Sequence, residues 1–172
     1  DSAVDFAGKA LAVDANEPKA HHATALSQMW LGNLDEAEAA ALQAIALDPN
    51  FAGAFAALGS ILDYAGKHEQ AVEALQRALR LDPEYNVALQ FLGRAQFWLG
   101  HYDEAEAAFK ERLVKVPGSD MTRAFLASLY GHTGRHQEAQ LLWRELREIN
   151  ADFSVERLRH VLPYVNSGWH DK

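Results

Sequence analysis

The sequence repeats itself every 34 residues, and this period constrains the fold more than any other feature of the chain. Four glycines, five alanines and three prolines keep this step. They are Gly32, Gly66, Gly100 and Gly134; Ala3, Ala37, Ala71, Ala105 and Ala139; and Pro49, Pro83 and Pro117. With glycine at about 7% of residues in average proteins, four in step at a given phase would be a coincidence of roughly two in 100,000. A period of this length is typical of a solenoid, in which each repeat packs on its neighbours.

Each period predicts a helix, a tight turn and a second helix. The recurring glycine follows an apolar stretch such as ALGSILDYAG, where a helix must end in a left-handed turn that glycine adopts cheaply. Acidic or amide residues follow, for example Asp35 and Glu36, and the acids suit the start of a new helix. The second helix ends at LDPN or LDPE, because proline cannot continue it. Small residues in the first helices predict close approach of two helix backbones: Ala25, Gly59, Gly93 and Ala127.

These recurring residues resemble the tetratricopeptide repeat (TPR) family, whose pattern is large–x2–Leu–Gly–x2–aromatic, then Ala, Phe and Pro. The best-matching period supplies Phe55, Leu58, Gly59, Leu62, Ala71, Leu75, Ala78 and Pro83. In the next period Gln96 replaces the aromatic residue and Arg112 replaces a small residue. The resemblance implies an all-α fold, a helix-turn-helix solenoid that forms a right-handed superhelix with a concave groove. It is specific for fold and weak for function, because the repeat serves many partners.

We predict a single TPR domain over residues 1–172. Residues 1–17 match only the second half of a repeat, which suggests that chain is missing upstream. Residues 154–172 begin in the first-helix phase of a fifth repeat, and Pro163 should kink or end that helix, so we expect a capping helix and tail. Between these half-repeats we predict four full repeats, at 18–51, 52–85, 86–119 and 120–153.

The start of this C-terminal segment has a resemblance of its own. The pattern D-x-F-S-x-E-R-L-R-x-x-L-P-Y resembles the C-terminal end of bacterial class III adenylate or guanylate cyclases that carry TPR regions. In that group the catalytic domain lies upstream, and the repeats are thought to regulate it or to bind partners. The final SGWHDK departs from the group's commoner continuation, and related tails occur on other bacterial TPR proteins. The residues that carry the resemblance are Asp152, Phe153, Ser154, Glu156, Arg157, Leu158, Arg159, Leu162, Pro163 and Tyr164.

Composition excludes several classes of function. Sixteen Lys and Arg against 24 Asp and Glu give a net charge of −8, which repels phosphate backbones, so we predict no nucleic-acid partner. The chain has no cysteine, which excludes disulfides and thiolate metal sites. No apolar run approaches the length of a membrane span, so we predict no membrane insertion and expect a cytoplasmic location, although a trimmed signal peptide stays open.

The predicted partner-binding groove lies on the first helices of successive pairs, because these line the concave side of such an array. Beside the core-facing stripe runs a second stripe, mostly apolar and aromatic, with one arginine near its middle. Aromatic and arginine residues are the usual anchors of protein interfaces. The predicted groove residues are His22, Leu26, Met29, Trp30, Asp63, Tyr64, Gln90, Phe91, Arg94, Phe97, Trp98, Phe125 and His132.

Structural interpretations compete with binding at these positions. Trp30 and Trp98 precede the turns, where they could equally pack between adjacent first helices. For the polar residues we favour a solvated groove wall over a specific contact: Arg94, Gln90 and Asp63. Trp143 lies in the core phase of its second helix, and we predict that it is a core residue.

The expected partner is a protein or peptide segment that is apolar or aromatic in part. Some TPR proteins capture the C-terminal carboxylate of a chaperone tail with a Lys/Asn clamp. Here the matching positions hold His22, Leu26, Ala57, Val87 and Phe91, so the clamp is absent. Extended or helical apolar segments remain as the ligand class.

We predict no metal, no cofactor and no catalytic activity for this stretch. The tightest histidine pairs are His21-His22 and His132-x3-His136, and the second pair spans a predicted turn, which is not zinc-motif spacing. No phosphate loop, nucleophile elbow or catalytic triad is visible. Two hypotheses remain: an interaction scaffold, in a larger bacterial signalling protein, and a self-assembly or spacer module that forms homo-oligomers through its terminal half-repeats. An RNA-reading repeat array is disfavoured by the acidity.

Overall fold

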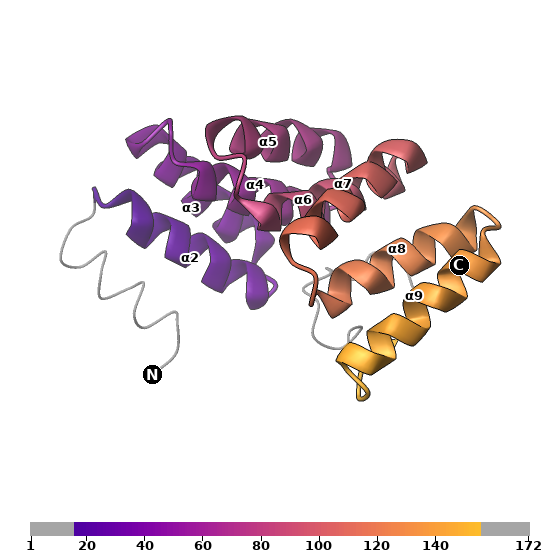
Figure 1. Ribbon diagram of the computed structural model, residues 1–172. Coiled ribbons are helices and arrows are strands. Elements are labelled where there is room, and N and C mark those ends of the chain that lie inside the picture. Colours follow the sequence, from indigo (N-terminus) through magenta and orange to yellow (C-terminus); the bar gives the residue numbers. More distant parts are fainter. Residues whose placement is uncertain (1–15, 156–172) are drawn as a thin grey trace.

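The computed structural model describes residues 16–155 of the chain, and this part is helical apart from turns (Figure 1). Most of the two predicted half-repeats, 1–17 and 154–172, lies outside the described residues. Between residues 16 and 155 there are eight helices: α2 (Pro18–Trp30), α3 (Leu34–Leu47), α4 (Ala52–Tyr64), α5 (His68–Leu81), α6 (Asn86–Trp98), α7 (Tyr102–Lys115), α8 (Asp120–His132) and α9 (His136–Ile149).

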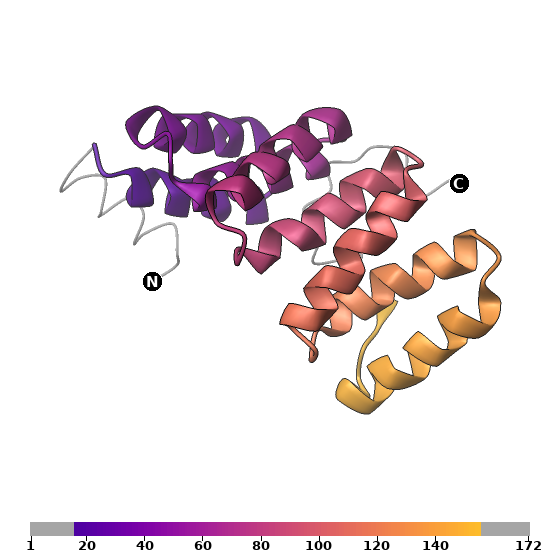
Figure 2. The ribbon, with the colours of Figure 1, turned by 45° about the horizontal axis from the view of Figure 1, so that its top comes forward.

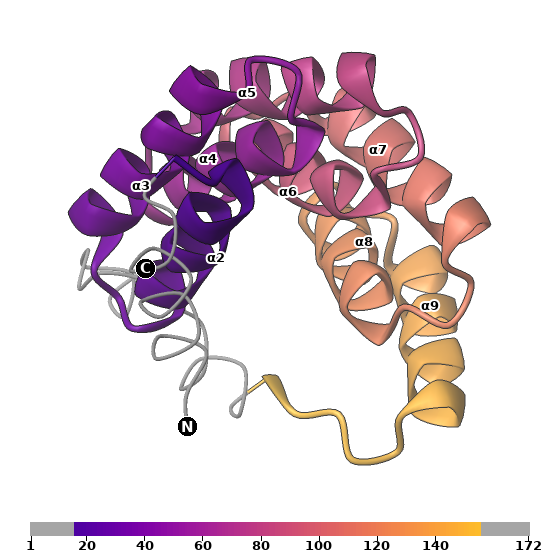
Figure 3. The same cartoon turned by 90° about the vertical axis from the view of Figure 1, so that its left-hand side faces the viewer.

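The helices stack in pairs along an arc (Figure 2). Within the pairs α2 packs on α3, α4 on α5, α6 on α7 and α8 on α9, and the second helix of each pair packs on the first helix of the next. The first helices α2, α4, α6 and α8 also contact one another in succession, whereas the second helices do not. Figure 3 shows the result, with the first helices on the inner side of the arc and the second helices outside. The predicted all-helical TPR solenoid is confirmed.

The turn inside each pair depends on the recurring glycine. Gly32, Gly66, Gly100 and Gly134 have φ angles of 82°, 76°, 79° and 80°, which side chains other than glycine adopt only under strain. Gly32 N–H donates to the Met29 carbonyl at 3.0 Å, and Asn33 N–H donates to the Gln28 carbonyl at 3.0 Å. The same two bonds recur at the other three turns. This is the Schellman motif, which satisfies the last carbonyls of the first helix and sends the chain back along it.

The second helices α3, α5 and α7 end two residues before a proline. Asp48 and Asp82 adopt extended backbone angles (φ −138° and −142°) before Pro49 and Pro83, as the proline ring demands of the residue before it. Their carboxylates also accept a hydrogen bond from the backbone two residues on. Helix α9 ends in the same way at Asn150 (φ −141°), although alanine follows it. The break is therefore set by the whole loop and does not require proline.

Small residues in the first helices make room for side chains of the second helices. A Cβ at Gly59 would lie 2.4 Å from the Leu75 side chain, and one at Gly93 would lie 2.5 Å from the Phe109 ring. The expected close approach is present, but at Gly93 all three nearest atoms belong to a side chain and none to the backbone. Leu75 and Phe109 are buried as a consequence, and each anchors a core cluster between helix pairs.

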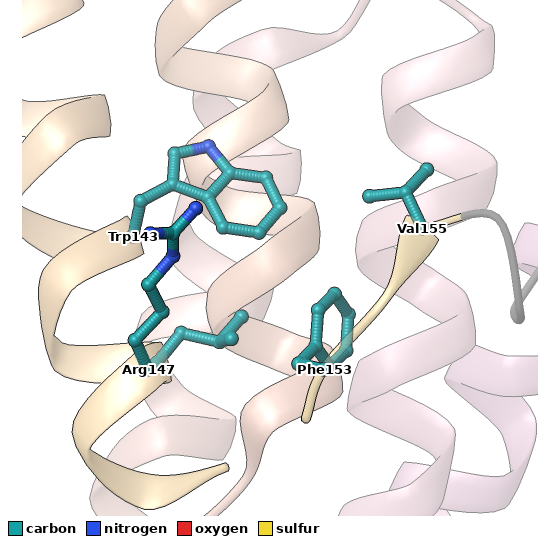
Figure 4. Close-up of a pocket in the computed structure, with 5 residues that line it drawn as sticks. Trp143, Arg147, Phe153 and Val155 are labelled. Atoms are coloured by element: carbon teal, nitrogen blue, oxygen red, sulfur yellow. The ribbon is translucent and has the colours of Figure 1, made fainter. Parts of the chain in front are cut away.

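Trp143 differs from its predicted role as a core residue. It is half-buried, and its ring lies 6.0 Å from that of Phe153, between ring centroids. The two rings border a cavity of about 440 Å³, which Leu146, Arg147 and Val155 also line (Figure 4). The prediction is wrong in this respect because α9 is the last described helix, and none of the helices between residues 16 and 155 covers this face of it.

Candidate partner-binding face

All thirteen predicted groove residues lie on the first helices α2, α4, α6 and α8, and we call this set the inner face. Their exposure divides them into three groups. Trp30, Trp98 and His132 are exposed; His22, Leu26, Phe91, Phe97 and Phe125 are half-buried; Met29, Asp63, Tyr64, Gln90 and Arg94 are buried. Only the first two groups present surface that a partner could touch without rearrangement.

A buried ion pair joins the second and third helix pairs beneath this face. Arg94 of α6 is 2% exposed, Asp63 of α4 is 1% exposed, and Nη2 lies 2.9 Å from Oδ2. The other carboxylate oxygen of Asp63 lies 3.1 Å from Nδ1 of His68, at the start of α5. The interpretation of Arg94, Gln90 and Asp63 as a solvated groove wall is therefore wrong. The first helices pack closely enough that their polar residues meet the neighbouring helix and lose contact with solvent.

Aromatic rings surround the guanidinium group of Arg94. Its Cζ lies 4.5 Å from the ring centroid of Tyr64, 5.1 Å from Phe91 and 5.2 Å from Phe125, distances typical of cation–π contacts. Burial raises the pKa of Tyr64 above its usual value, although Arg94 acts in the opposite direction. The arginine thus fixes three aromatic side chains from three successive first helices. We infer a positioning role for Arg94, since its charge is already balanced by Asp63.

The exposed tryptophans pack against neighbouring rings and still keep exposed surface. Trp98 stacks on His68, with ring centroids 6.1 Å apart and planes 24° apart, and is still 37% exposed. Trp30 contacts the ring of Tyr64 at 6.5 Å and is 53% exposed. The packing interpretation therefore applies to both, since Trp30 contacts α4 of the following repeat and Trp98 contacts α5 of the preceding repeat. Both keep exposed surface, and their role in binding stays a prediction.

His132 is the fourth residue at this repeat position, and a different contact holds it. Its Nε2 lies 2.8 Å from the hydroxyl of Tyr102, at the start of α7. The Phe97 ring touches both of these side chains. The pairing of Tyr102 with His132 repeats that of His68 with Trp98, one repeat further on. A row of aromatic and histidine side chains therefore follows the C-terminal ends of the first helices.

Charge is distributed unequally between the two layers of helices. The first helices carry five formally charged side chains: Lys19, Asp63, Arg94, Asp120 and Arg123. The second helices carry 19, of which 12 are acidic. The inner side of the arc is therefore nearly neutral and apolar, and the net negative charge lies on the outer side.

Residues that the sequence analysis did not assign to the site join the third and fourth pairs. Arg112 of α7 donates from Nε to the Thr122 hydroxyl at 2.9 Å and from Nη1 to the Asn86 carbonyl at 2.6 Å. The Thr122 hydroxyl donates in turn to Gln90 Oε1 at 2.6 Å. Burial lowers the pKa of Arg112. Its departure from the small residue of the family pattern was the signal that could have identified this network.

A second polar cluster lies on the outer side of the same junction. Glu106 of α7 accepts hydrogen bonds from Tyr130 at 2.9 Å and from Arg135, and it pairs with Lys110. Partial burial alone would raise the pKa of Glu106, but hydrogen bonds from Arg135, Lys110 and Tyr130 lower it to about 2. Arg135 also lies 3.8 Å over the Tyr130 ring. This cluster fixes the turn between α8 and α9 against α7.

Histidines of the inner face have packing partners. His22 lies against the Phe51 ring at 5.1 Å, and burial lowers its pKa. In the described part of the chain, no three His, Cys, Asp or Glu side chains are grouped to hold a metal ion. None of the helices searched between residues 16 and 155 is both long and apolar enough to cross a membrane.

Sequence comparisons point to one family. Two family profiles, each described as a tetratricopeptide repeat, match residues 22–86 and 64–121, which together span more than half of the chain. No curated protein sequence matches it.

Solved structures agree in fold. A thermophilic TPR protein of Thermus thermophilus is similar with a TM-score of 0.78 and 26% identity, over 93% of this chain and 88% of that chain. MamA is similar with a TM-score of 0.72 and 23% identity, over 91% of this chain and 89% of that chain. PilF of Pseudomonas aeruginosa has a TM-score of 0.74 and 20% identity, over 84% of this chain and 66% of that chain. Its turn motif recurs four times and its helices stack in pairs, and the chain belongs to the tetratricopeptide repeat family.

Proposed function

We propose that this chain is a non-catalytic scaffold that binds a segment of a partner protein along the inner face. The segment is apolar or aromatic in part, and it is extended or helical. One observation carries the proposal: Trp30 and Trp98 keep exposed surface on the inner side of the arc, while the charges at its centre, Arg94 and Asp63, are buried and paired. Concave surfaces of this kind are what stacked-repeat proteins use for binding.

The exposed tryptophan surface is large enough to matter for affinity. With roughly 200–250 Å² for a whole tryptophan, the exposed fractions of 53% and 37% leave on the order of 100 Å² on each ring. Covering that area would contribute about 2–3 kcal/mol per residue at 25 cal/mol per Å². Micromolar binding requires about 8 kcal/mol, so these two residues could supply a large share of it before the costs of association.

The near-neutral inner side also defines the partner's chemistry. A strongly charged segment would lose hydration there and find few opposite charges, since Arg94 and Asp63 already pair with each other. A segment with aromatic or aliphatic side chains loses little favourable hydration there and gains free energy from the burial of its apolar surface. We therefore expect uncharged residues where the partner meets the centre of the inner face.

The test is selection of binders from a library of displayed peptides on the immobilised full chain, followed by calorimetric titration of the selected peptides. Trp98→Ala should weaken binding about 30-fold, the equivalent of roughly 2 kcal/mol. Leu42→Ala is the matched control, because Leu42 is 49% exposed but lies on the outer helix α3. Selected peptides that bind Trp98→Ala and Trp30→Ala as tightly as the wild type would refute the proposal.

We further propose that the chain is a regulatory region of a larger bacterial signalling protein. Support comes from the C-terminal motif that resembles TPR-bearing cyclases, of which Asp152, Phe153 and Ser154 lie in the described part. The full reading frame tests this: a frame with no catalytic domain upstream of Asp1 would contradict it. Sedimentation at several concentrations distinguishes the partner-binding scaffold from the alternative of a self-assembling module, because end-to-end docking would raise the measured mass as the concentration rises.

A further inference from the structure

We propose that Arg112 binds a carboxylate side chain of the partner segment, so that this segment carries an aspartate or glutamate at a fixed distance from its aromatic anchor. The inference rests on the proposed function, because it concerns the same partner, and it adds one charged residue to a segment that is otherwise apolar. Arg112 stands where the repeat pattern has a small residue, and it is not one of the positions that match the Lys/Asn clamp.

The guanidinium group of Arg112 lies between the starts of two first helices. Its Nε donates to the hydroxyl of Thr122, at the start of α8, at 2.9 Å. Its Nη1 donates to the carbonyl and the side-chain oxygen of Asn86, which begins α6, at 2.6 and 2.9 Å. These bonds leave the two N–H donors of Nη2. Nη2 meets no acceptor among residues 16–155, and it is open to solvent.

The positive charge of Arg112 is not balanced by an acid. Arg94, Arg123 and Arg135 each lie within 3.3 Å of a carboxylate oxygen. In the described part of the chain, no carboxylate lies within salt-bridge distance of Arg112. Burial lowers the pKa of this side chain, and no acid opposes the effect. A carboxylate on Nη2 would therefore form a charge-assisted hydrogen bond, roughly twice as strong as a neutral one.

The charge of the whole chain limits what this site can accept. A net charge of −8 repels phosphates and runs of acidic residues. A single carboxylate within an apolar segment meets much less of this repulsion. The free donors of Arg112 are those of one nitrogen, which suits one carboxylate oxygen better than a larger anion. The chemistry therefore favours a single aspartate or glutamate in the partner.

The carboxylate site and the exposed tryptophan surface lie at opposite ends of α6. Asn86 and Trp98 are the first and last residues of this helix. At about 1.5 Å per residue, they are separated by about 18 Å along its axis. An extended segment covers this distance in about five or six residues, and a helical segment needs about twelve. We expect the partner's acid at one of these two spacings from the aromatic residue that meets Trp98.

The test uses the displayed-peptide selection on the immobilised full chain, and the selected peptides are synthesised with an amidated C-terminus. They should share an aspartate or glutamate at one of the two spacings from an aromatic residue. Replacing that acid by its amide should weaken binding to the wild type about tenfold in calorimetric titration, and should not change binding to Arg112→Gln. Arg80→Gln is the matched control, because Arg80 is exposed on the outer helix α5, and it should respond as the wild type does.

Three results would overturn the proposal. One is a set of selected peptides without a shared acid. Another is an acid whose replacement weakens binding equally in the wild type and in Arg112→Gln. The third is binding that requires a free C-terminal carboxylate, since the ligand would then be a chain end.

The wild type alone provides a test if Arg112→Gln does not fold. In NMR spectra of the full chain, a selected peptide should shift the side-chain Nε resonance of Arg112, and its amide analogue should not. Equal shifts with the two peptides would overturn the proposal.

Failure of this inference is distinguishable from failure of the proposed function. Peptides that depend on Trp98 but not on Arg112 would remove only the carboxylate contact and leave the inner face as the binding site. Peptides that depend on Arg112 but not on Trp30 or Trp98 would refute the proposed function and the expected spacing, while the carboxylate contact itself would stand. Titration of each selected peptide against the tryptophan variants and Arg112→Gln separates these cases.

Discussion

Replacing Arg94 with methionine removes one half of the buried ion pair and keeps most of its length. The carboxylate of Asp63 would then lie buried with His68 as its described neighbour, and breaking a buried pair in this way costs about 3–5 kcal/mol. Loss of the contacts to three rings adds to this cost, at about 0.5–1 kcal/mol each. We expect Arg94→Met to destabilise the chain by about 5 kcal/mol and to lower the melting temperature by about 15 °C.

The assay is urea unfolding followed by circular dichroism, with amide hydrogen exchange of α4 and α6 to locate the loss. Asp63→Asn should cost a similar amount. The double variant should cost no more than either single variant, because it leaves no charge without its partner. Arg80→Met is the control, since Arg80 is exposed on α5, and it should change stability by less than about 0.5 kcal/mol. Two results would refute the conclusion that this ion pair holds α4 and α6 together. One is a loss of unfolding free energy below about 1 kcal/mol for Arg94→Met. The other is a double variant whose loss equals the sum of the losses of the two single variants.

Three further variants test other parts of the structure. Gly93→Ala should destabilise the chain by about 1–3 kcal/mol, because its Cβ would lie 2.5 Å from the Phe109 ring. The control is Gly118→Ala, whose Cβ would meet no atom within 4 Å and which should not change stability. Equal midpoints of urea unfolding for the two variants would contradict the close packing at Gly93. Thr122→Val removes a fully buried hydroxyl that hydrogen-bonds to three side chains, and it should lower the free energy of unfolding by about 2–3 kcal/mol in the same assay. An unchanged free energy of unfolding would contradict this role of the hydroxyl. Glu106 has its pKa lowered to about 2 from 4.5, so its contribution is present above pH 4.5 and is lost as the pH falls towards 2. Glu106→Gln should therefore be less stable than the wild type by about 1–2 kcal/mol at pH 7 and equally stable near pH 2. If the difference in unfolding free energy stayed constant across this pH range, the hydrogen bonds to the charged carboxylate would not be its cause.

The period of 34 residues was enough to predict the helix pairs and their turns. Gly32 and its three counterparts occur where a left-handed residue is required, and each has the expected positive φ. The phase of the period also placed Trp30, Trp98 and the other predicted groove residues on the first helices. These features depend on the local conformational preferences of the backbone, and the same residues indicate them in each repeat.

Side-chain partners between repeats could not be predicted in the same way. Equivalent residues lie 34 apart, but ion pairs between successive helix pairs join residues 29 or 31 apart, as Asp63 with Arg94 and Glu106 with Arg135 do. The offset depends on how one pair rotates on the next, and a helical period does not contain that rotation. Arg94 was therefore assigned to the groove wall, although packing of α4 on α6 encloses it. Complementary charges at these two spacings would have been the usable signal.

The two layers of the solenoid respond differently to bending. The first helices touch one another from α2 to α8, whereas the second helices touch only first helices. A change of curvature would therefore alter the distances between successive second helices more than those between successive first helices, and it would strain the ion pairs that join the outer layer across repeats, Glu38 with Lys67 and Glu106 with Arg135. The aromatic side chains of the inner face lie on the first helices, so their spacing should change less than that of the outer helices if the curvature changes.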